Sequence, residues 1–298
     1  MRFKAIYLII FSLEAVMAVA HADTLEVCGD IRQGELLVIK SSNSQAGFSI
    51  FEELEDKTFQ ELKYPVADDG TILVALKRDA PRKITFSAFP GTDFGTAYDV
   101  EVAPQNWDIQ RIDGVPEGKV TPSRESQAEI QRERRDLGRV LTAINRHDYW
   151  RKGFIVPVKG RISGNFGNQR VFNGIPKSPH TGADIAAPEG TPVKAAGDGV
   201  VVLSGKDYFY TGNMVVIDHG QGLQTIYAHL KDASVKEKDA VKKGDVIGHV
   251  GQTGRATGAH LHWGASLNNV RFNPYSLLDV NEKSCIFIKG VYGGDVMK

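Results

Sequence analysis

Two short stretches about eighty residues apart carry side chains that could bind a metal ion. They are His180-Thr181-Gly182-Ala183-Asp184 and Ala259-His260-Leu261-His262-Trp263. Side chains alternate between the two faces of a strand, so His180 and Asp184 would point the same way, as would His260 and His262. Imidazole and carboxylate ligands suit zinc best, although iron, manganese and nickel are chemically allowed. Three protein ligands with one open position describe a catalytic metal site.

The chain has eight histidines, and they do not carry equal weight. His21, His147, His219 and His249 stand in contexts typical of a targeting segment, a helix end, a turn and a strand, where ordinary surface or packing use is expected. A lone HxH or HxxxD occurs by chance in many chains. Here both motifs share one Gly-rich β region with a third element, Tyr227-Ala228-His229-Leu230, and this combination favours a functional site.

The amino-acid composition limits the classes of protein to which the chain can belong. The 298 residues are 42% apolar and 24% charged, which is ordinary for a globular chain long enough for two domains. The 36 basic and 36 acidic side chains balance, so there is no overall field to attract nucleic acid or an acidic membrane surface. We therefore expect no nucleic-acid partner. The oligomeric state is not predicted.

The first 22 residues resemble a signal peptide. Arg2 and Lys4 form a basic start, an apolar run follows, and Ala20-His21-Ala22 offers small residues at the positions that a signal peptidase reads. Glu14 interrupts the apolar run, so an uncleaved N-terminal anchor stays as the alternative. Either way the remainder is exported, and we expect a periplasmic or secreted protein without stable membrane insertion after signal removal.

The two cysteines lie near the two ends of the exported chain. In an oxidising compartment Cys28 and Cys285 either form a disulfide or stay as two unpaired thiols. A lipid anchor at Cys28 is not expected, because Val27 stands where a lipoprotein signal has a small residue.

Hydrophobic patterning predicts a mainly β chain in two parts joined by a helix. Residues 23–104 are expected to form a small β-sandwich without chemistry of its own, whose task is packing, targeting or covering the second part. Residues 105–150 are predicted to be a linker with an amphipathic helix that opens at Thr121-Pro122, and residues 281–298 a C-terminal tail. Residues 151–280 are expected to form a Gly-rich antiparallel sheet. Its predicted strands are 200–203, 213–218, 223–230, 246–250 and 260–266.

The histidine motifs stand in longer strings that resemble a known family. The strings are HTGADIAAPEGTPVKAAGDGVVV from His180, NMVVIDHGQGLQTIYAHL up to Leu230, VKKGDVIGHVGQTGRATGAHLHWG up to Gly264, and Asn273-Pro274. Residues from about 164 to 278 are similar to the LytM and lysostaphin type of zinc metallopeptidase, peptidase family M23, with its duplicated hybrid motif type of fold. The N-terminal part and the helix resemble accessory segments of exported enzymes in this family only in their layout.

The resemblance implies a role for each histidine. His180, Asp184 and His262 match the family's zinc ligands, and His229 and His260 match its two catalytic histidines. The expected function is a zinc-dependent endopeptidase that cleaves peptide cross-links of peptidoglycan through a zinc-bound water. There is no HExxH glutamate, so histidine must perform the acid and base work. Arg170 in segment 167–179, and Tyr208 and Tyr210 in loop 207–212, are candidates for the substrate groove, although burial of the tyrosines in the core is an alternative.

Two other functions stay open at this point. Some LytM-type domains have lost their ligands and activate cell-wall amidases instead, and a structural zinc domain could simply bind the wall. The first would not need all three ligands, and the second would not need His229 or His260. The bond cleaved is also open between a glycine bridge and an amide joining D-alanine to a diamino acid, and we expect the latter.

Overall fold

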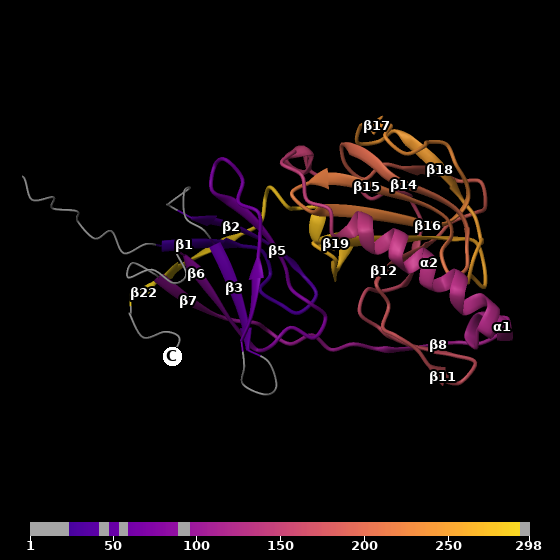
Figure 1. Cartoon of the computed structure of the whole chain (residues 1–298), viewed down its shortest axis with the longest axis horizontal. Coiled ribbons are helices and arrows are strands. Elements are labelled where there is room, and N and C mark those ends of the chain that lie inside the picture. Colours follow the sequence, from indigo (N-terminus) through magenta and orange to yellow (C-terminus); the bar gives the residue numbers. More distant parts are fainter. Residues whose placement is uncertain (1–23, 42–47, 54–58, 89–95, 293–298) are drawn as a thin grey trace, which may run out of the picture.

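The computed structural model describes residues 24–41, 48–53, 59–88 and 96–292, and Figure 1 shows them in colour. The expected signal peptide, residues 1–22, lies outside these ranges. Within them, no helix combines the length and the apolar character needed to cross a bilayer.

The N-terminal half consists of two antiparallel sheets that pack together. One has the order β21-β1-β2-β5 and the other β22-β7-β6-β3-β4. Alternate side chains such as Val27, Ile39 and Phe86 are buried in one shared cluster, which is why these segments read as half-buried strands. The strands are β1 (Thr24–Cys28), β2 (Leu36–Ser41), β3 (Phe48–Glu53), β4 (Phe59–Lys63), β5 (Thr71–Ala75), β6 (Lys83–Ala88), β7 (Thr96–Glu101), β21 (Cys285–Lys289) and β22 (Val291–Tyr292).

The C-terminal segment returns to these N-terminal sheets. Residues 281–298 were expected to be a tail, but β21 pairs antiparallel with β1, and β22 with β7. Figure 1 shows this yellow segment running back among the indigo and purple strands. Cys28 and Cys285 stand opposite each other in the β1–β21 register and form a disulfide. The disulfide therefore joins β1, near the start of the described residues, to β21, near their end.

The C-terminal half is built on a ten-stranded, mainly antiparallel sheet with the central order β17-β14-β15-β16-β19-β12-β9. β13 pairs with β18, β18 also pairs with β16, and β20 pairs with β19. All five strands predicted for this half are present. The strands are β9 (Arg161–Gly164), β12 (Gly182–Ala186), β13 (Pro192–Lys194), β14 (Gly199–Tyr208), β15 (Gly212–Gly220), β16 (Leu223–Ala233), β17 (Ala240–Val241), β18 (Val246–Val250), β19 (His260–Leu267) and β20 (Val270–Phe272).

The two faces of this sheet have different coverings. On β19, Leu261, Trp263 and Ala265 are buried in the large core cluster, so His260 and His262 point to the opposite face. Helix α2 (Arg124–Leu141) covers part of that opposite face, where Val140 and Leu141 pack on side chains of β14, β15 and β16. The prediction of a mainly β chain with a linking helix is confirmed.

The linking helix begins later than the sequence pattern suggested. A short helix, α1 (Glu117–Val120), precedes α2, and Ser123 caps α2 by accepting a hydrogen bond from the backbone amide of Ser126. Thr121 does not cap α2, because it ends α1 instead, where its backbone amide donates to the carbonyl oxygen of Glu117 at 2.8 Å. The linker also contributes β8 (Ile109–Ile112), which pairs in parallel with β10 (Gln169–Phe172) beside β11 (Ile175–Pro176). Two short 3-10 helices, η1 (Tyr149–Lys152) and η2 (Pro274–Leu277), complete the described elements.

Candidate metal centre and active site

Three side chains from the two motifs meet on the open face of the sheet. Nε2 of His180 lies 3.0 Å from Nδ1 of His262 and 3.1 Å from Oδ1 of Asp184, and His262 Nδ1 lies 3.0 Å from the same carboxylate oxygen. Donor atoms around a tetrahedral zinc, each at about 2.0 Å from it, stand roughly 3.3 Å apart. The trio therefore fits such an ion in both chemistry and spacing.

Strand pairing brings the ligands together across the chain. β12 and β19 run antiparallel with Asp184 opposite His262 and Gly182 opposite Gly264. His180 lies two residues before β12, on the same side. A Cβ atom at Gly182 would stand 2.9 Å from Nε2 of His262 and 2.5 Å from the carbonyl oxygen of Trp263, so glycine is needed for the His262 ring to lie over this strand.

Neighbouring groups orient the ligands. Nδ1 of His180 donates to the carbonyl oxygen of Asn165 at 2.9 Å, which leaves Nε2 without a proton and free to bind a metal. The second carboxylate oxygen of Asp184 pairs with the guanidinium of Arg170. Arg170 was expected in the substrate groove; it lines the cavity described below and also holds a ligand of the metal trio.

Two further histidines lie beside the trio. The ring centroids of His229 and His260 are 4.7 Å apart, and His260 Nε2 is 3.8 Å from Oδ1 of Asp184. His229 donates from Nδ1 to the carbonyl oxygen of Thr253 at 2.8 Å, and His260 to that of Gly258 at 2.8 Å. Both rings are thus held through Nδ1, and both keep Nε2 available for chemistry.

The position of His229 depends on a local irregularity. Its φ of 63° lies in the left-handed region, and its amide donates to the carbonyl oxygen of Thr211 at 2.8 Å instead of continuing a regular ladder. The register of β16 against β15 shifts in the same stretch, between Asn213 and Val215. Such strained residues are often found at functional sites. Here the left-handed backbone conformation of His229 turns its ring toward the trio, and the ring centroids of His229 and His262 lie 6.0 Å apart.

Burial sets the charge states of the site. It lowers the pKa of His262 to about 4 and that of His229 to about 3. Burial alone would raise the pKa of Asp184, but hydrogen bonds and charge interactions with His180 and His262 hold it well below its usual range. Neutral imidazoles beside an ionised carboxylate are the protonation states that a metal ion requires.

A cavity of about 390 Å³ opens at the trio. His180, His229 and His262 line it, together with Tyr210 and Arg170 from the predicted groove. Tyr208 does not line it, and packs instead against the cluster under α2. The other lining residues are Arg134, Lys177, Ser178, Pro179, Thr181, Thr211 and Arg255.

Sequence reasoning did not single out Arg134 or Arg255. Arg134 comes from α2, which the sequence predicted only as an amphipathic helix of the linker. Arg255 lies in the loop between β18 and β19, which also supplies the carbonyl groups of Thr253 and Gly258 that hold the two histidines. The resemblance already covered this loop, but no spacing rule indicates that Arg255 reaches the cavity.

Two further histidines, His219 and His249, make contacts away from the trio. His219 is fully buried, with Nδ1 2.6 Å from the carbonyl oxygen of Asp198 and Nε2 2.7 Å from the hydroxyl of Thr225. Nδ1 of His249 lies 2.7 Å from Oδ1 of Asp232 near the surface, within hydrogen-bonding distance. Neither lines the cavity at the trio.

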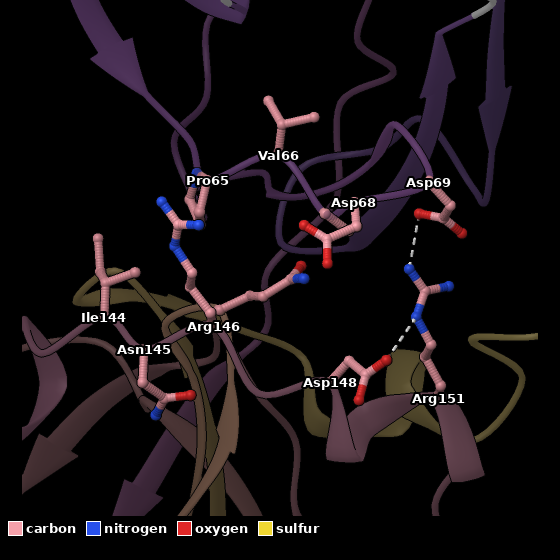
Figure 2. Close-up of a pocket in the computed structure, with 11 residues that line it drawn as sticks. Pro65, Val66, Asp68, Asp69, Ile144, Asn145, Arg146, Asp148 and Arg151 are labelled. Atoms are coloured by element: carbon pink, nitrogen blue, oxygen red, sulfur yellow. Dashed lines mark hydrogen bonds and ion pairs between the residues drawn. The ribbon is translucent and has the colours of Figure 1, made fainter. Parts of the chain in front are cut away.

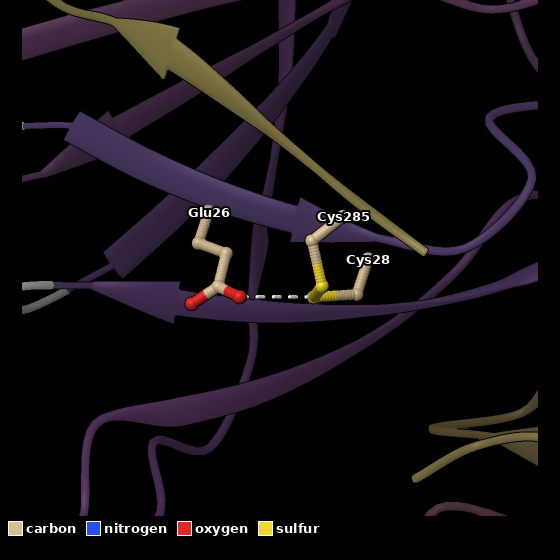
Figure 3. Close-up of side chains that lie close together, drawn as sticks. All are labelled: Glu26, Cys28 and Cys285. Atoms are coloured by element: carbon tan, nitrogen blue, oxygen red, sulfur yellow. Dashed lines mark hydrogen bonds between the residues drawn. A yellow bond between two sulfur atoms is a disulfide. The ribbon is translucent and has the colours of Figure 1, made fainter. Parts of the chain in front are cut away.

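Two other places look like sites but differ in chemistry. Figure 3 shows Glu26 beside Cys28 and Cys285, but the sulfur atoms are joined in a disulfide and offer no thiolate for a metal. A cavity of about 610 Å³ lies between residues 65–69 and 144–151. Figure 2 shows its lining residues, among which Arg151 bridges Asp69 and Asp148. None of the site histidines lines that cavity.

Comparison with known proteins gives the same assignment for the C-terminal half. The sequence model of peptidase family M23 matches residues 178–274, a range that includes all five side chains described above. Residues 178–274 form a peptidase family M23 domain. The resemblance inferred from the sequence strings is confirmed.

Named relatives share this M23 domain. The chain is 51% identical over 98 residues to DD-carboxypeptidase/endopeptidase Mpg of Neisseria meningitidis serogroup B, an alignment that covers 33% of this chain and 22% of Mpg. It is 47% identical over 109 residues to peptidoglycan DD-endopeptidase ShyA of Vibrio cholerae, covering 36% of this chain and 25% of ShyA. The matched part thus spans about a quarter of the length of these relatives.

One solved structure matches beyond the M23 domain. A Pseudomonas aeruginosa protein described as a peptidase M23 superposes with a TM-score of 0.62 at 26% identity, covering 85% of this chain and 97% of that one. Because 85% exceeds the M23 domain alone, the likeness extends into the N-terminal half. This supports the fold assignment for both halves.

Proposed function

We propose that this protein is a zinc-dependent endopeptidase that hydrolyses peptide cross-links of peptidoglycan. One observation carries the proposal: Nε2 of His180, Nδ1 of His262 and Oδ1 of Asp184 stand 3.0–3.1 Å apart beside two histidines whose Nε2 atoms are free. The relatives named as peptidoglycan DD-endopeptidases support the substrate class and an action outside the cytoplasm.

His180, Asp184 and His262 would hold the zinc ion. When bound there, zinc would polarise a carbonyl group and lower the pKa of a water to about 7. The Arg170 guanidinium keeps the Asp184 carboxylate in place and partly neutralises it. The Asn165 carbonyl keeps His180 in the tautomer that ligation needs.

His229 and His260 would move protons. With Nδ1 donating to a backbone carbonyl, Nε2 of each neutral ring accepts a proton or a hydrogen bond from the attacking water. The protonated ring then donates that proton to the nitrogen of the leaving amine. Burial disfavours the charged form of His229, which makes the neutral ring a weaker base and the protonated ring a stronger proton donor.

The test is digestion of defined muropeptide dimers by the purified protein, with products weighed by mass spectrometry. Release of monomers with intact sugar–peptide linkages is expected. A variant with His180→Ala and His262→Ala together should lose both zinc and activity. Free stem peptides would indicate an amidase, and failure of zinc-loaded protein to cleave would favour an activator of amidases.

The N-terminal half is proposed to position the enzyme or to control access. Arg78 donates to the carbonyl oxygen of Gly167 at 2.6 Å, and Gly167 in turn donates to that of His180 at 2.9 Å. No described residue of 24–103 lines the cavity at the trio, whereas Arg134 of the linking helix does. The linking helix is therefore the better candidate for a wall of the groove.

A further inference from the structure

The cavity at the metal trio is strongly basic. Four of its lining residues are cationic, namely Arg134, Arg170, Lys177 and Arg255, and none of its lining residues is Asp or Glu. A pocket whose walls carry charge of one sign attracts ligands of the opposite sign. The cavity is therefore suited to a substrate with an anionic group.

Among the described residues, three of the four cations have no carboxylate as a partner. Arg170 pairs with Asp184, but within the described part of the chain no carboxylate pairs with Arg134, Lys177 or Arg255. Burial lowers the pKa of Arg255 to about 10, which still leaves it protonated at neutral pH. A half-buried guanidinium that no carboxylate neutralises is costly unless a ligand supplies the negative charge.

Arg255 is held in place by two aromatic rings. Its guanidinium carbon lies 4.5 Å from the ring centre of Phe172 and 4.3 Å from that of Tyr210. Its backbone amide donates to the carbonyl oxygen of Tyr210 at 2.9 Å. Stacking of this kind leaves the edge of the guanidinium, which carries its N–H groups, free to bind a carboxylate with two hydrogen bonds.

Arg255 is also coupled to the catalytic histidines. The loop 251–259 that carries it supplies the carbonyl oxygens of Thr253 and Gly258, which accept from His229 and His260. One short segment thus sets the positions of both proton-transferring rings and of the unpaired guanidinium. A group bound by Arg255 would therefore be held at a fixed position relative to the two histidines and to the bond on which they act.

We infer that Arg255 binds the carboxylate that neighbours the scissile amide on its amine side, with Lys177 and Arg134 adding positive charge. The inference rests on the proposed function and names its substrate class. In a cross-link between a D-alanyl carbonyl and an amino-bearing D-centre, that centre also carries a free carboxylate, one carbon from the scissile nitrogen. A glycine bridge has no carboxylate there. Arg255 is thus a specificity-determining residue that selects cross-links of the first kind.

The experiment compares two synthetic cross-linked peptides that differ only at this carboxylate, free in one and a primary amide in the other. The wild-type protein should hydrolyse the free acid with a kcat/KM roughly 10- to 10²-fold above that of the amide, as expected for a charge-assisted hydrogen bond. Arg255→Gln should lower kcat/KM for the acid far more than for the amide, so that the ratio of the two falls toward one, while the zinc content stays near that of the wild type. Arg255→Lys keeps the positive charge but cannot donate two parallel hydrogen bonds. Its kcat/KM for the acid should therefore lie between those of the wild type and Arg255→Gln. Arg132→Gln, an exposed position of α2 outside the cavity, is the matched control and should keep full discrimination.

Each other outcome is decisive. Equal rates of wild type on acid and amide would overturn the carboxylate site while leaving the endopeptidase assignment intact, as would an Arg255→Gln variant that loses both activities equally. If neither peptide is cleaved, the proposed function fails, and titration of the same two peptides by NMR then decides the binding site. Tighter binding of the acid that disappears in Arg255→Gln would support the site, and equal binding would overturn it.

Discussion

The histidines of the site differ in which ring nitrogen forms a hydrogen bond with the protein backbone. His180, His229 and His260 each donate from Nδ1 to a backbone carbonyl, whereas Nδ1 of His262 faces the trio. A ring anchored in this way presents one defined nitrogen, and its role then depends on where that nitrogen points. His180 points at the other two ligands, while His229 and His260 stand beside them.

The first residue-scale prediction separates ligands from proton carriers. His229→Ala should lower turnover by roughly 10²-fold or more while bound zinc stays near one per chain, because the ring acts on the reaction and not on the metal. Zinc is measured by elemental analysis of protein purified without added metal. His180→Ala, in the same assay, should lose zinc as well as activity. Loss of zinc from the His229 variant would mean that the ligand set is different.

A second residue-scale prediction concerns acid stability. Burial lowers the pKa of His219 from 6.5 to about 4, so between these values the unfolded chain binds a proton that the folded chain excludes. The free energy of unfolding should therefore decrease as the pH falls from about 6.5 to 4, by up to about 3 kcal/mol from this residue, and level off below. Urea titrations of metal-free protein at several pH values measure it. In His219→Gln, whose side chain does not titrate, the slope over this range should be smaller by about one proton, and an unchanged slope would contradict the assignment.

At the scale of elements, the pairing of β12 with β19 decides the geometry of the proposed metal centre. It places Asp184 opposite His262, and it needs Gly182 because the His262 ring lies over that position. The loop 251–259 and the helix α2 then complete the walls of the cavity from outside the sheet. The relative positions of Asp184 and His262 are therefore fixed by the pairing of these two strands.

The element-scale prediction uses two glycines with opposite surroundings. Gly182→Ala would place a Cβ 2.8–2.9 Å from His262 Cε1 and Nε2, so the ring must shift and zinc affinity should fall by at least 10-fold. Gly138→Ala in α2 meets nothing within 4 Å and should raise the free energy of unfolding by about 0.5–1 kcal/mol through helix propensity. Competition with a chromogenic chelator reports affinity, and urea unfolding reports stability. Normal zinc affinity in Gly182→Ala would show that the ring has room that the structure does not indicate.

At the scale of the whole molecule, the two halves share one hydrophobic core and one covalent closure. The same cluster of buried side chains includes Phe86 from the N-terminal sheets and Trp263 from behind the metal centre. The Cys28–Cys285 disulfide closes a sequence separation of 257 residues and fixes β21 against β1. The N-terminal sheets are thus completed by the last part of the chain.

The whole-molecule prediction follows from that closure. Replacing both cysteines, Cys28→Ser with Cys285→Ser, should lower the free energy of unfolding by about 2–5 kcal/mol, because the unfolded chain is no longer restricted by the cross-link. Zinc content and peptide hydrolysis at 25 °C should stay near wild type, since neither cysteine contacts the cavity. Thermal unfolding with and without reductant makes the comparison. If reductant leaves the melting temperature of the wild type unchanged, the two ends are not covalently joined.

Local patterns in the sequence were enough to predict the strands that carry the motifs and the five side chains of the candidate centre. Alternation along 260–266 predicts that His260 and His262 share a face, and the HxxxD spacing predicts the same for His180 and Asp184. These inferences hold because they depend on neighbours a few residues apart. His229 was included because it lies in the same Gly-rich β region, and the resemblance of the surrounding strings then implied its role.

Contacts between distant residues were decided only by the tertiary structure. The pairing of Arg170 with Asp184, the placement of Arg134 and Arg255 in one cavity, and the separation of Tyr210 from Tyr208 all depend on how elements pack. The return of the C-terminal strands to β1 and β7 likewise depends on sheet edges far away in the sequence. Periodicity describes one element at a time, and it carries no information about which elements become neighbours or where a left-handed residue such as His229 turns its ring.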